Sequence, residues 1–370
     1  MARVAFFDPY LHILGGGEKV LLTILEDVAA EGTHEVVIMS PDRPELDRWK
    51  RLNIAVDPGR LRWRRANAAS ATPLSAAADL FIALVNHFPP LSLARHAAAI
   101  VQFPFARIDD GWGPVGRLRA VERRRRLASY DSVVCYSEFV AAEIRARLRV
   151  PDPVVISPPV DLPETIPAGP KERKVIAVGR FFAATDANNK KHDVLIDAWR
   201  RLEAAGPEPG WELHLVGGVH SDPASIAYVE HLRERARGAA IHFHPNAAAD
   251  VLTDLYRRSA LFWHAAGFGE TRAERHEHFG ITTVEAMAYG CVPVVVRLGG
   301  QLEIVADGVS GRLWSTMPEL VAITRELMSD PGQLEALRRQ ALERATRFGK
   351  AAFVRATRER ILEPAGVHVG

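Results

Sequence analysis

Strand-like segments alternate with helical ones along the whole chain, and this pattern restricts the fold more than any other feature of the sequence. Short runs of β-branched and apolar residues stand between segments whose apolar residues recur at helical spacing. Strands that alternate with helices in this way favour parallel sheets built from βα units. The runs are RVAFFD, HEVVIMS, DLFIALV, AAAIVQF and DSVVCYS, followed by KVIAVGR, ELHLVGG, AIHFH, ALFWHA and CVPVVV.

A proline-rich segment separates these strands into two groups of similar size. Residues 157–173, SPPVDLPETIPAGPKER, lack any periodicity and are rich in turn-forming residues. A chain of 370 residues also exceeds what one hydrophobic core usually organises. We therefore predict an α/β protein with two Rossmann-like, doubly wound domains that face each other across a cleft. The ligand is expected in that cleft, because loops at the carboxyl ends of parallel strands form the binding crevice.

The expected domain bounds follow from this division. The N-terminal domain is placed at residues 1–160, a linker at 161–173 and the C-terminal domain at 174–345. A C-terminal helix is expected at 346–370, and its return to the N-terminal domain is left open.

Composition indicates an ordinary globular chain. The sequence is 48% hydrophobic and 25% charged, and no apolar run reaches the roughly 18 residues needed to cross a bilayer. The segment MARVAFFDPYLH has no apolar core typical of an export signal, so we expect a soluble, cytoplasmic chain. Cys135 and Cys291 are the only cysteines, each in or beside an apolar run, which predicts buried thiols and excludes a cysteine-bound metal cluster.

Arginines gather in two places in the first half of the chain. They could belong to solvated surfaces with packed stems, or they could bind an anionic partner such as a phosphorylated lipid head group or the inner membrane face. Nucleic acid is not expected, because no groove-reading motif is present. The two clusters are Arg60, Arg62, Arg64 and Arg65, and then Arg117, Arg119, Arg123, Arg124, Arg125 and Arg126.

A glycine-rich loop follows the first predicted strand. Gly15, Gly16 and Gly17 directly precede an amphipathic helix, where glycine permits close approach of a ligand and the helix start offers free N–H groups. A phosphate or a sugar hydroxyl would suit this loop, although a simple turn from strand to helix is the alternative. Val20 occupies the position of the third glycine of the dinucleotide-binding fingerprint, so that motif is excluded.

Three basic residues follow the first strand of the second half. Arg180 ends KVIAVGR, and Lys190 and Lys191 stand just before the next helix. Arginine binds phosphate through paired hydrogen bonds and lysine acts as a point charge, so the group could hold a pyrophosphate and neutralise it as a leaving group. Solvated lysines are the alternative.

Two glutamates mark the most informative segment, HEHFGITTVEAMAYGCVPVVV. Glu277 and Glu285 stand eight residues apart around the start of a helix, and the amides of Phe279, Gly280 and Ile281 would face a phosphate. Glu277 could accept hydrogen bonds from sugar hydroxyls, and Glu285 could bind a ribose diol; a purely structural role for both is the alternative. A sugar hydrolase also uses two carboxylates, but it would not need the glycine loop and the basic group.

With these segments in place, the sequence resembles family 4 of the retaining glycosyltransferases. The resemblance runs from GGGEKV through YSEFVAAEI and VGRFF to the glutamate pair and GGQLEIVADGVSG. The segments EHFGI and GGGE resemble those of the subgroup that contains the dolichol-linked oligosaccharide α-1,2-mannosyltransferase. The resemblance implies a GT-B fold and transfer of a hexose from a nucleotide diphosphate sugar, GDP-mannose first and UDP-sugars next, to a glycan, glycolipid or small-molecule acceptor.

The resemblance also implies roles for individual residues. Arg180 and Lys190 would grip the donor pyrophosphate, Glu277 the donor sugar and Glu285 the ribose. The residues implied to face the reacting region are Gly16 and Gly17. No cofactor is expected, because the nucleotide sugar is a substrate. The chain has no D-x-D sequence to hold a metal ion at the pyrophosphate, so no metal is expected there either.

Two departures from the family pattern leave other functions open. Gln102 in VQFPF stands where relatives commonly carry a histidine, and His87 in NHFPP is a possible substitute. The loop HAAGFGETRAERH, residues 264–276, also looks long, and it could shape substrate choice or be a surface insertion. A nucleotide-sugar-binding subunit without turnover, or a nucleotide-sugar epimerase on the same architecture, therefore stays as an alternative.

Overall fold

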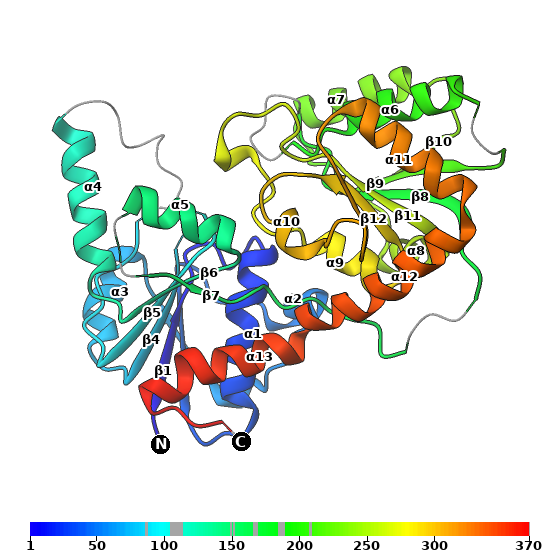
Figure 1. Ribbon diagram of the computed structural model, residues 1–370. Helices are drawn as coiled ribbons and strands as arrows, with labels where there is room; N and C mark the ends of the chain where they lie inside the picture. The colour runs from blue at the N-terminus through cyan, green and yellow to red at the C-terminus, as the bar shows by residue number, and fades with distance from the viewer. Residues whose placement is uncertain are drawn as a thin grey trace. The chain divides into compact units, whose positions relative to one another are not determined.

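The computed structural model contains two compact α/β units (Figure 1). The first unit combines Met1–Pro159 with Lys350–Gly370, and the second is Val160–Gly349. The structure describes residues 1–85, 88–103, 114–148, 150, 152–165, 169–183, 189–206 and 209–369.

The first unit is built on a seven-stranded parallel sheet with the order β3-β2-β1-β4-β5-β6-β7. Every residue of the central strand β4 is buried, as expected where helices cover both faces of a parallel sheet. The strands are β1 (Arg3–Phe7), β2 (Glu35–Ser40), β3 (Leu61–Arg65), β4 (Leu80–Val85), β5 (His96–Val101), β6 (Ser132–Cys135) and β7 (Val154–Val155).

Helices from both ends of the chain complete the first unit. The C-terminal helix α13 packs on α1, where Arg358 forms a two-pronged ion pair with Asp27 at 2.7 and 2.9 Å and Lys350 contacts Glu26 at 2.6 Å. The helices are α1 (Gly16–Ala30), α2 (Leu46–Trp49), α3 (Ala68–Ser75), α4 (Pro114–Leu127), α5 (Glu138–Leu148) and α13 (Lys350–Thr357), with short turns η1 (Lys50–Leu52), η2 (Pro58–Arg60), η5 (Arg358–Leu362) and η6 (Glu363–Ala365).

The second unit repeats this plan with a six-stranded parallel sheet, in the order β10-β9-β8-β11-β12-β13. Its strands are β8 (Glu172–Val178), β9 (Glu212–Gly217), β10 (Ile241–Pro245), β11 (Ser259–His264), β12 (Val292–Val296) and β13 (Arg312–Trp314). Its helices are α6 (His192–Ala204), α7 (Pro223–Arg235), α8 (Ala249–Arg258), α9 (Ile281–Ala288), α10 (Gln301–Ile304), α11 (Met317–Ser329) and α12 (Pro331–Ala345), with short turns η3 (Ala273–Arg275) and η4 (Thr346–Phe348).

Side chains alternate between the two faces of the second unit's sheet, and each face packs against different helices. Val175, Leu213 and Leu261 belong to one core with residues of α6, α7 and α11, so these helices cover one face (Figure 1). Side chains one position away point to the opposite face, on which α8 contacts β8 and α9 contacts β11 and β12.

The predicted fold class is confirmed: both units are Rossmann-like, and each of the ten predicted strands is present. Three strands were not predicted. In β3, LRWRR, arginines replace the apolar run because the strand lies at the edge of its sheet, and β7 and β13 have only two and three residues. The strand β8 begins at Glu172, inside the expected linker.

Two expectations from composition also have an outcome. Both cysteines are buried and neither forms a disulfide, as predicted. Among the described residues, no helix combines the length and the apolar character that a bilayer crossing requires. The expected cleft between the domains stays a prediction.

Candidate functional site

The candidate site of the second unit lies where the strand order of its sheet reverses. Successive strands β8, β9 and β10 run toward one edge and β11, β12 and β13 toward the other, so β8 and β11 are neighbours at the reversal. Open parallel sheets bind ligands beyond the carboxyl ends of the strands at such a point. Arg180 follows β8, and His264 is the last residue of β11.

Two glycines allow a basic side chain to approach the end of β8. A Cβ atom on Gly217 would lie 1.9 Å from the carbonyl oxygen of Gly179, so the strand ends can meet only without a side chain there. A Cβ atom on Gly179 would lie 2.7 Å from Cγ of Lys190, which shows that the lysine stem crosses this residue. Arg180 is exposed, with its guanidinium 4.5 Å from the ring centre of Phe182. The structure therefore brings Arg180 and Lys190 to the same strand end.

The carboxylate of Glu277 contacts both Lys190 and His264. Its Oε2 accepts a hydrogen bond from Nζ of Lys190 at 2.7 Å and lies 3.2 Å from Nε2 of His264, while the side chain is only 18% exposed. Burial alone would raise the pKa of Glu277, but Lys190 and His264 outweigh it and hold the pKa well below its ordinary value. Glu277 is therefore ionised at neutral pH and available as a hydrogen-bond acceptor.

The backbone around Glu277 is held by a pair of glycines. The N–H of Gly300 donates to the carbonyl oxygen of Glu277 at 2.8 Å. Gly299 has a φ of +59°, and a Cβ atom there would lie 2.3 Å from the same carbonyl oxygen. On Gly300 a Cβ atom would lie 2.5 Å from Cα of Phe279. The GGQLE segment thus fixes the position of the glutamate motif through backbone contacts that a side chain would break.

Two residues of this site were not predicted. His264 is 4% exposed, and its Nδ1 lies 3.4 Å from Nε2 of Gln301, which is fully buried. Gly280, with a φ of +121°, leaves room for that amide, because a Cβ atom there would lie 2.6 Å from Nε2 of Gln301. The strand end at His264 and the two glycines before Gln301 are visible in the sequence, but the contact between them, across 37 residues, is not.

The helix α9 places the second glutamate. It begins at Ile281, and the first amides of a helix have no partner within it, as the predicted phosphate contact requires. The Phe279 ring is buried against Phe348, with ring centres 5.6 Å apart, so this residue could offer only its backbone. Glu285 accepts a hydrogen bond from the hydroxyl of Tyr256 at 3.1 Å. Burial and this glutamate raise the pKa of the Tyr256 hydroxyl well above its ordinary value.

Lys191 is engaged by the loop that looked like an insertion. Its Nζ lies 2.6 Å from Oε1 of Glu270, and a guanidinium nitrogen of Arg275 lies 3.4 Å from Oε2 of the same glutamate. Lys191 also has a left-handed backbone, with its N–H donating to Asn189 at 2.7 Å. Loop 264–276 therefore contacts the start of α6 and is part of the site's surroundings.

The glycine loop lies in the first unit, after β1, where that sheet's strand order also reverses. The N–H of Gly15 donates to Glu18 at 2.6 Å, and α1 begins at Gly16. A Cβ atom on Gly17 would lie 1.8 Å from Nε2 of Gln102, so this glutamine side chain rests on the loop. A joint role of Gly16 and Gly17 with the residues of the second unit stays a prediction. His87 lies outside the described residues.

An unpredicted acid stands next to this loop. Asp8 is fully buried at the end of β1; one carboxylate oxygen accepts the N–H of Tyr10 at 2.7 Å, and the other has no hydrogen-bond partner among the described residues. Burial, together with the charge of Glu18, raises the pKa of Asp8 to about 7. Asp8 therefore titrates near neutral pH in the folded protein.

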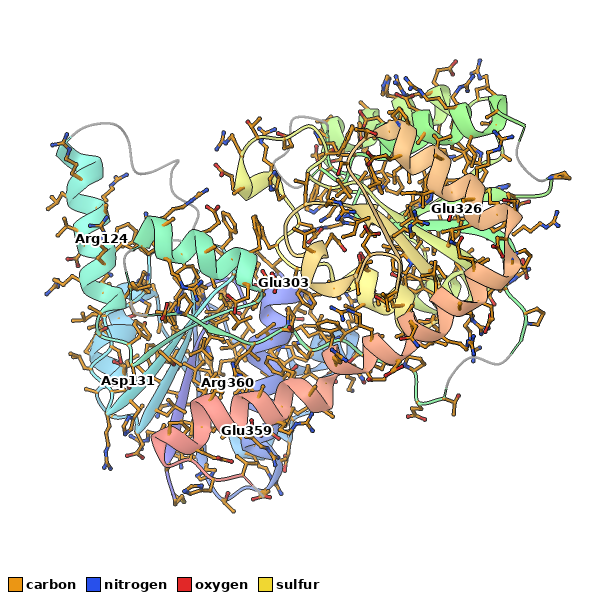
Figure 2. All side chains as sticks on the ribbon, in the orientation of Figure 1. Arg124, Asp131, Glu303, Glu326, Glu359 and Arg360 are labelled. Atoms are coloured by element: carbon orange, nitrogen blue, oxygen red, sulfur yellow. The ribbon has the colours of Figure 1, made fainter. Side chains whose placement is uncertain are left out.

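The arginine clusters divide into packed and exposed members. Arg123 is 7% exposed, and it and Arg126 lie over the ring of Phe88 at 5.4 and 5.6 Å. On β3, Arg62 pairs with Glu35 at 2.9 Å. These three are accounted for by packing and ion pairing, whereas the exposed Arg117 and the half-buried Arg124 lie on α4 near exposed apolar residues (Arg124 is labelled in Figure 2).

The architecture is that of the GT-B class. The structure of an Anabaena protein, Alr3699/HepE, in complex with UDP and glucose superposes with a TM-score of 0.69, at 18% identity, over 97% of this chain and 99% of that one. The likeness establishes the two-domain fold.

Sequence comparison then defines the family. The family described as Glycosyl transferases group 1 matches residues 162–347, and the one described as Glycosyltransferase Family 4 matches residues 14–164. The chain belongs to the group 1 glycosyl transferases, and the predicted resemblance to family 4 is confirmed.

Three curated relatives match parts of the chain at 27–34% identity. Mannosylfructose-phosphate synthase of Agrobacterium fabrum is 34% identical over 36% of this chain, and a D-inositol 3-phosphate glycosyltransferase of Catenulispora acidiphila is 27% identical over 72%. A GDP-Man:Man(3)GlcNAc(2)-PP-Dol alpha-1,2-mannosyltransferase of Dictyostelium discoideum is 30% identical over 38% of the chain. The matched regions span 27%, 64% and 27% of these relatives' own lengths, respectively.

Proposed function

We propose that this protein is a retaining glycosyltransferase that moves a hexose from a nucleotide diphosphate sugar to an acceptor. The observation that carries the proposal is the pair of contacts that Glu277 makes with Lys190 and with His264 at the strand-order reversal of the second unit. It places a cation, an ionised acceptor and an imidazole at the position where parallel sheets bind ligands.

The pyrophosphate is assigned to Arg180, Lys190 and the first turn of α9. The Lys190 charge is held by Glu277 at 2.7 Å, so the lysine is already positioned before a donor arrives. A bound diphosphate would share this lysine and take the paired N–H groups of Arg180, while the α9 amides would add further donors.

The two glutamates are assigned to opposite ends of the donor. Glu277, ionised and close to His264, would orient the hydroxyls of the sugar. Glu285, held by Tyr256, would accept the hydroxyls of the ribose. Lys191 would add positive charge near the donor while its ion pair with Glu270 holds it in place.

The chemistry requires stabilisation of the departing diphosphate more than a nucleophile from the protein. Negative charge grows on the leaving oxygen as the bond to the anomeric carbon breaks, so fixed cations and amides at the phosphate lower the barrier. In the retaining mechanism the acceptor hydroxyl attacks from the same face, and the departing phosphate oxygen takes its proton. Arg180 and Lys190 supply the positive charge that a metal ion would otherwise provide.

The donor is proposed to be GDP-mannose, with UDP-sugars next. The mannosyl transfer in the names of two relatives supports the first, and the UDP bound to the Anabaena protein supports the second. The relatives named for phosphate-bearing products or acceptors, together with Arg117 and Arg124 of α4, favour a phosphorylated or lipid-linked acceptor bound by the first unit.

A ligand panel tests this function directly. GDP-mannose, GDP, UDP-glucose and UDP are titrated into the protein by calorimetry, and transfer to acceptor pools is followed with a labelled donor. We expect one family of nucleotide to bind, and Arg180→Ala and Lys190→Ala to weaken the diphosphate far more than the nucleoside. Arg173→Ala, an exposed arginine at the start of β8, is the matched control.

Three outcomes would contradict the proposal in different ways. Donor binding without transfer or hydrolysis would indicate a nucleotide-sugar-binding subunit. Gln102, where relatives commonly carry a histidine, would then be a reason for the missing turnover. Conversion of the donor sugar without an acceptor would indicate an epimerase. Unchanged diphosphate affinity in both variants would remove the pyrophosphate assignment.

A further inference from the structure

Four side chains with metal-binding chemistry lie together on β9 and β10, outside the candidate donor site. Glu212 and His214 are two residues apart on β9, and His242 and His244 are two apart on β10. Residues at this spacing share a face of a sheet, and the register pairs His242 directly with His214. Because Leu213 belongs to the core on the opposite face, all four side chains are on the face away from α6 and α7.

The separations of three of these groups are close to those of a formed metal site. Oε2 of Glu212 lies 3.2 Å from Nε2 of His214 and 3.8 Å from Nε2 of His242. The ligand atoms of the three residues all lie within 4.8 Å of one another. Ligands at about 2.0–2.2 Å from a tetrahedral zinc ion are about 3.3–3.6 Å apart, so only the half-exposed His242 must move appreciably.

The fourth side chain supports the first three. Nε2 of His244 lies 3.0 Å from Nδ1 of His214, and the two rings stack with centres 5.3 Å apart. If Nε2 of His214 binds a metal ion, its Nδ1 carries the hydrogen and donates it to His244. Metal-bound histidines almost always donate their other ring N–H in this way, which fixes the tautomer and the orientation of the ring.

A nearby cation is compensated by an acid other than Glu212. Lys174 on β8 is the register partner of Glu212, which would place a positive charge beside a bound ion. However, Nζ of Lys174 lies 2.8 Å from Oε2 of Glu172. Glu212 is therefore not consumed by the lysine, and its carboxylate is directed to the two histidines.

We propose that Glu212, His214 and His242 bind a divalent transition-metal ion, zinc in the first place, with His244 as the supporting hydrogen-bond acceptor. Two imidazoles and one carboxylate suit zinc better than magnesium or calcium, which prefer oxygen ligands. A fourth position remains for water. The cluster includes the first residue of β9, whereas the donor site lies beyond the carboxyl ends of β8 and β11, so the ion would join the edge strand β10 to β9.

Zinc titration of the tag-free, full-length protein tests this site. The protein is freed of metal with a chelator, the chelator is removed, and zinc binding is measured by competition with an indicator. The parent protein should bind one zinc ion per chain. His242→Ala and Glu212→Gln should each weaken binding at least about tenfold, in line with losses seen even for supporting residues. His231→Ala, an exposed histidine on α7, is the matched control.

Melting curves with and without zinc check that the site acts on this fold. Zinc should raise the melting temperature of the parent and of the control but not of the two site variants, because only binding to the folded state stabilises it. Equal melting temperatures of all four proteins without zinc would show that the variants fold. The proposal is overturned if the parent takes up less than one equivalent, or if both variants bind zinc as the parent does.

Discussion

Glu277 combines two requirements that usually conflict, since it is mostly buried and yet ionised. The contact with Lys190 at 2.7 Å resolves the conflict, because it compensates the carboxylate charge where water is scarce. In the proposed assignment, this pair would also join the two ends of the reacting centre, because the lysine would bind the pyrophosphate and the glutamate the sugar. Removing either partner would leave the other charge uncompensated.

The two glutamates should therefore differ in kinetic effect. Glu285→Gln should mainly raise the donor KM, because a ribose contact acts equally in the ground and transition states. Glu277→Gln should mainly lower kcat, because the sugar must be oriented as its anomeric carbon leaves the phosphate. A lost hydrogen bond to a charged group is worth roughly 1.5–3 kcal/mol, or about a 10- to 150-fold effect.

Steady-state kinetics on both variants, with titration of the free nucleotide diphosphate, measures these effects. If Glu277→Gln lost nucleotide affinity while Glu285→Gln kept it, the roles would be exchanged. Changes below about threefold in both quantities, far short of a lost charged hydrogen bond, would assign the motif a structural role.

Asp8 predicts a pH-dependent stability of the first unit. With a pKa of about 7 in the folded state, against about 3.9 in the unfolded chain, the folded protein holds the extra proton between these values. Its free energy of unfolding should therefore fall as pH rises from about 4 to 7 and then level off. Asp8→Asn removes this dependence, so relative to the parent it should gain about 2–3 kcal/mol between pH 5 and pH 8.

Urea midpoints of parent and variant at pH 5 and pH 8 measure this gain. Asp42→Asn, at an exposed aspartate of the same unit, should show no such difference between the two pH values. An Asp8→Asn effect of the same size at both pH values would mean that Asp8 is ionised in the folded protein throughout this range.

At the level of elements, the sequence predicts what is buried better than what lies at an edge. Every central strand was recognisable from its apolar run, because both faces of a parallel sheet are covered. The edge strand β3 was not, since its arginines looked like a charge cluster. In the same way, Arg180, Lys190 and the glutamates were identifiable from local motifs, whereas the roles of His264 and Gln301 depend on a contact across 37 residues. Glu270 and the histidines of β9 and β10 also acquire partners only through the fold.

We propose that the helix α4 can contact an anionic membrane. Leu118 and Val121 are 69% and 58% exposed and share one side of the helix with Arg117 and Arg124. Exposed apolar residues next to arginines are typical of helices that lie on a lipid surface. Arg123 and Arg126 pack on Phe88 instead, so they would contribute less to such a contact.

We expect Arg117→Ser combined with Arg124→Ser to weaken binding to phosphatidylserine vesicles, and added salt to weaken binding by the parent through screening. Leu118→Ser should weaken binding by a similar factor at every salt concentration, because it removes apolar contact and keeps the arginines. The control is Arg43→Ser combined with Arg95→Ser, which removes the same charge from exposed positions of the same unit. Sedimentation with vesicles measures all four proteins. Parent binding that is absent, or that is equal in the arginine variant and the control, would contradict a membrane role for α4.

At the level of the whole molecule, one plan is used twice. Both sheets are parallel, both reverse their strand order at an internal pair of strands, and each reversal is followed by a glycine-rich segment or a basic group. The differences between the units then suggest a division of labour. The candidate site of the second unit combines basic side chains with buried acceptors, which would suit a nucleotide diphosphate sugar, while the first unit offers the glycine loop and the arginines of α4.

The last prediction concerns metal ions and separates catalysis from stability. The proposed donor site relies on Arg180, Lys190 and the α9 amides, and the chain has no D-x-D sequence, so transfer should persist in excess chelator. The zinc proposed at β9 and β10 lies away from that site, so the same chelator should lower the melting temperature while leaving the initial rate unchanged. His242→Ala should have the parent's initial rate and a melting temperature that does not respond to chelator.

Initial rates well below the melting transition, measured with EDTA and after adding back zinc, magnesium or manganese, decide between the alternatives. Activity lost in EDTA and restored by magnesium or manganese would contradict the proposed treatment of the leaving group, because it would place an essential metal ion at the diphosphate. Activity restored only by zinc, and lost in His242→Ala as well, would instead connect the β9–β10 cluster to catalysis.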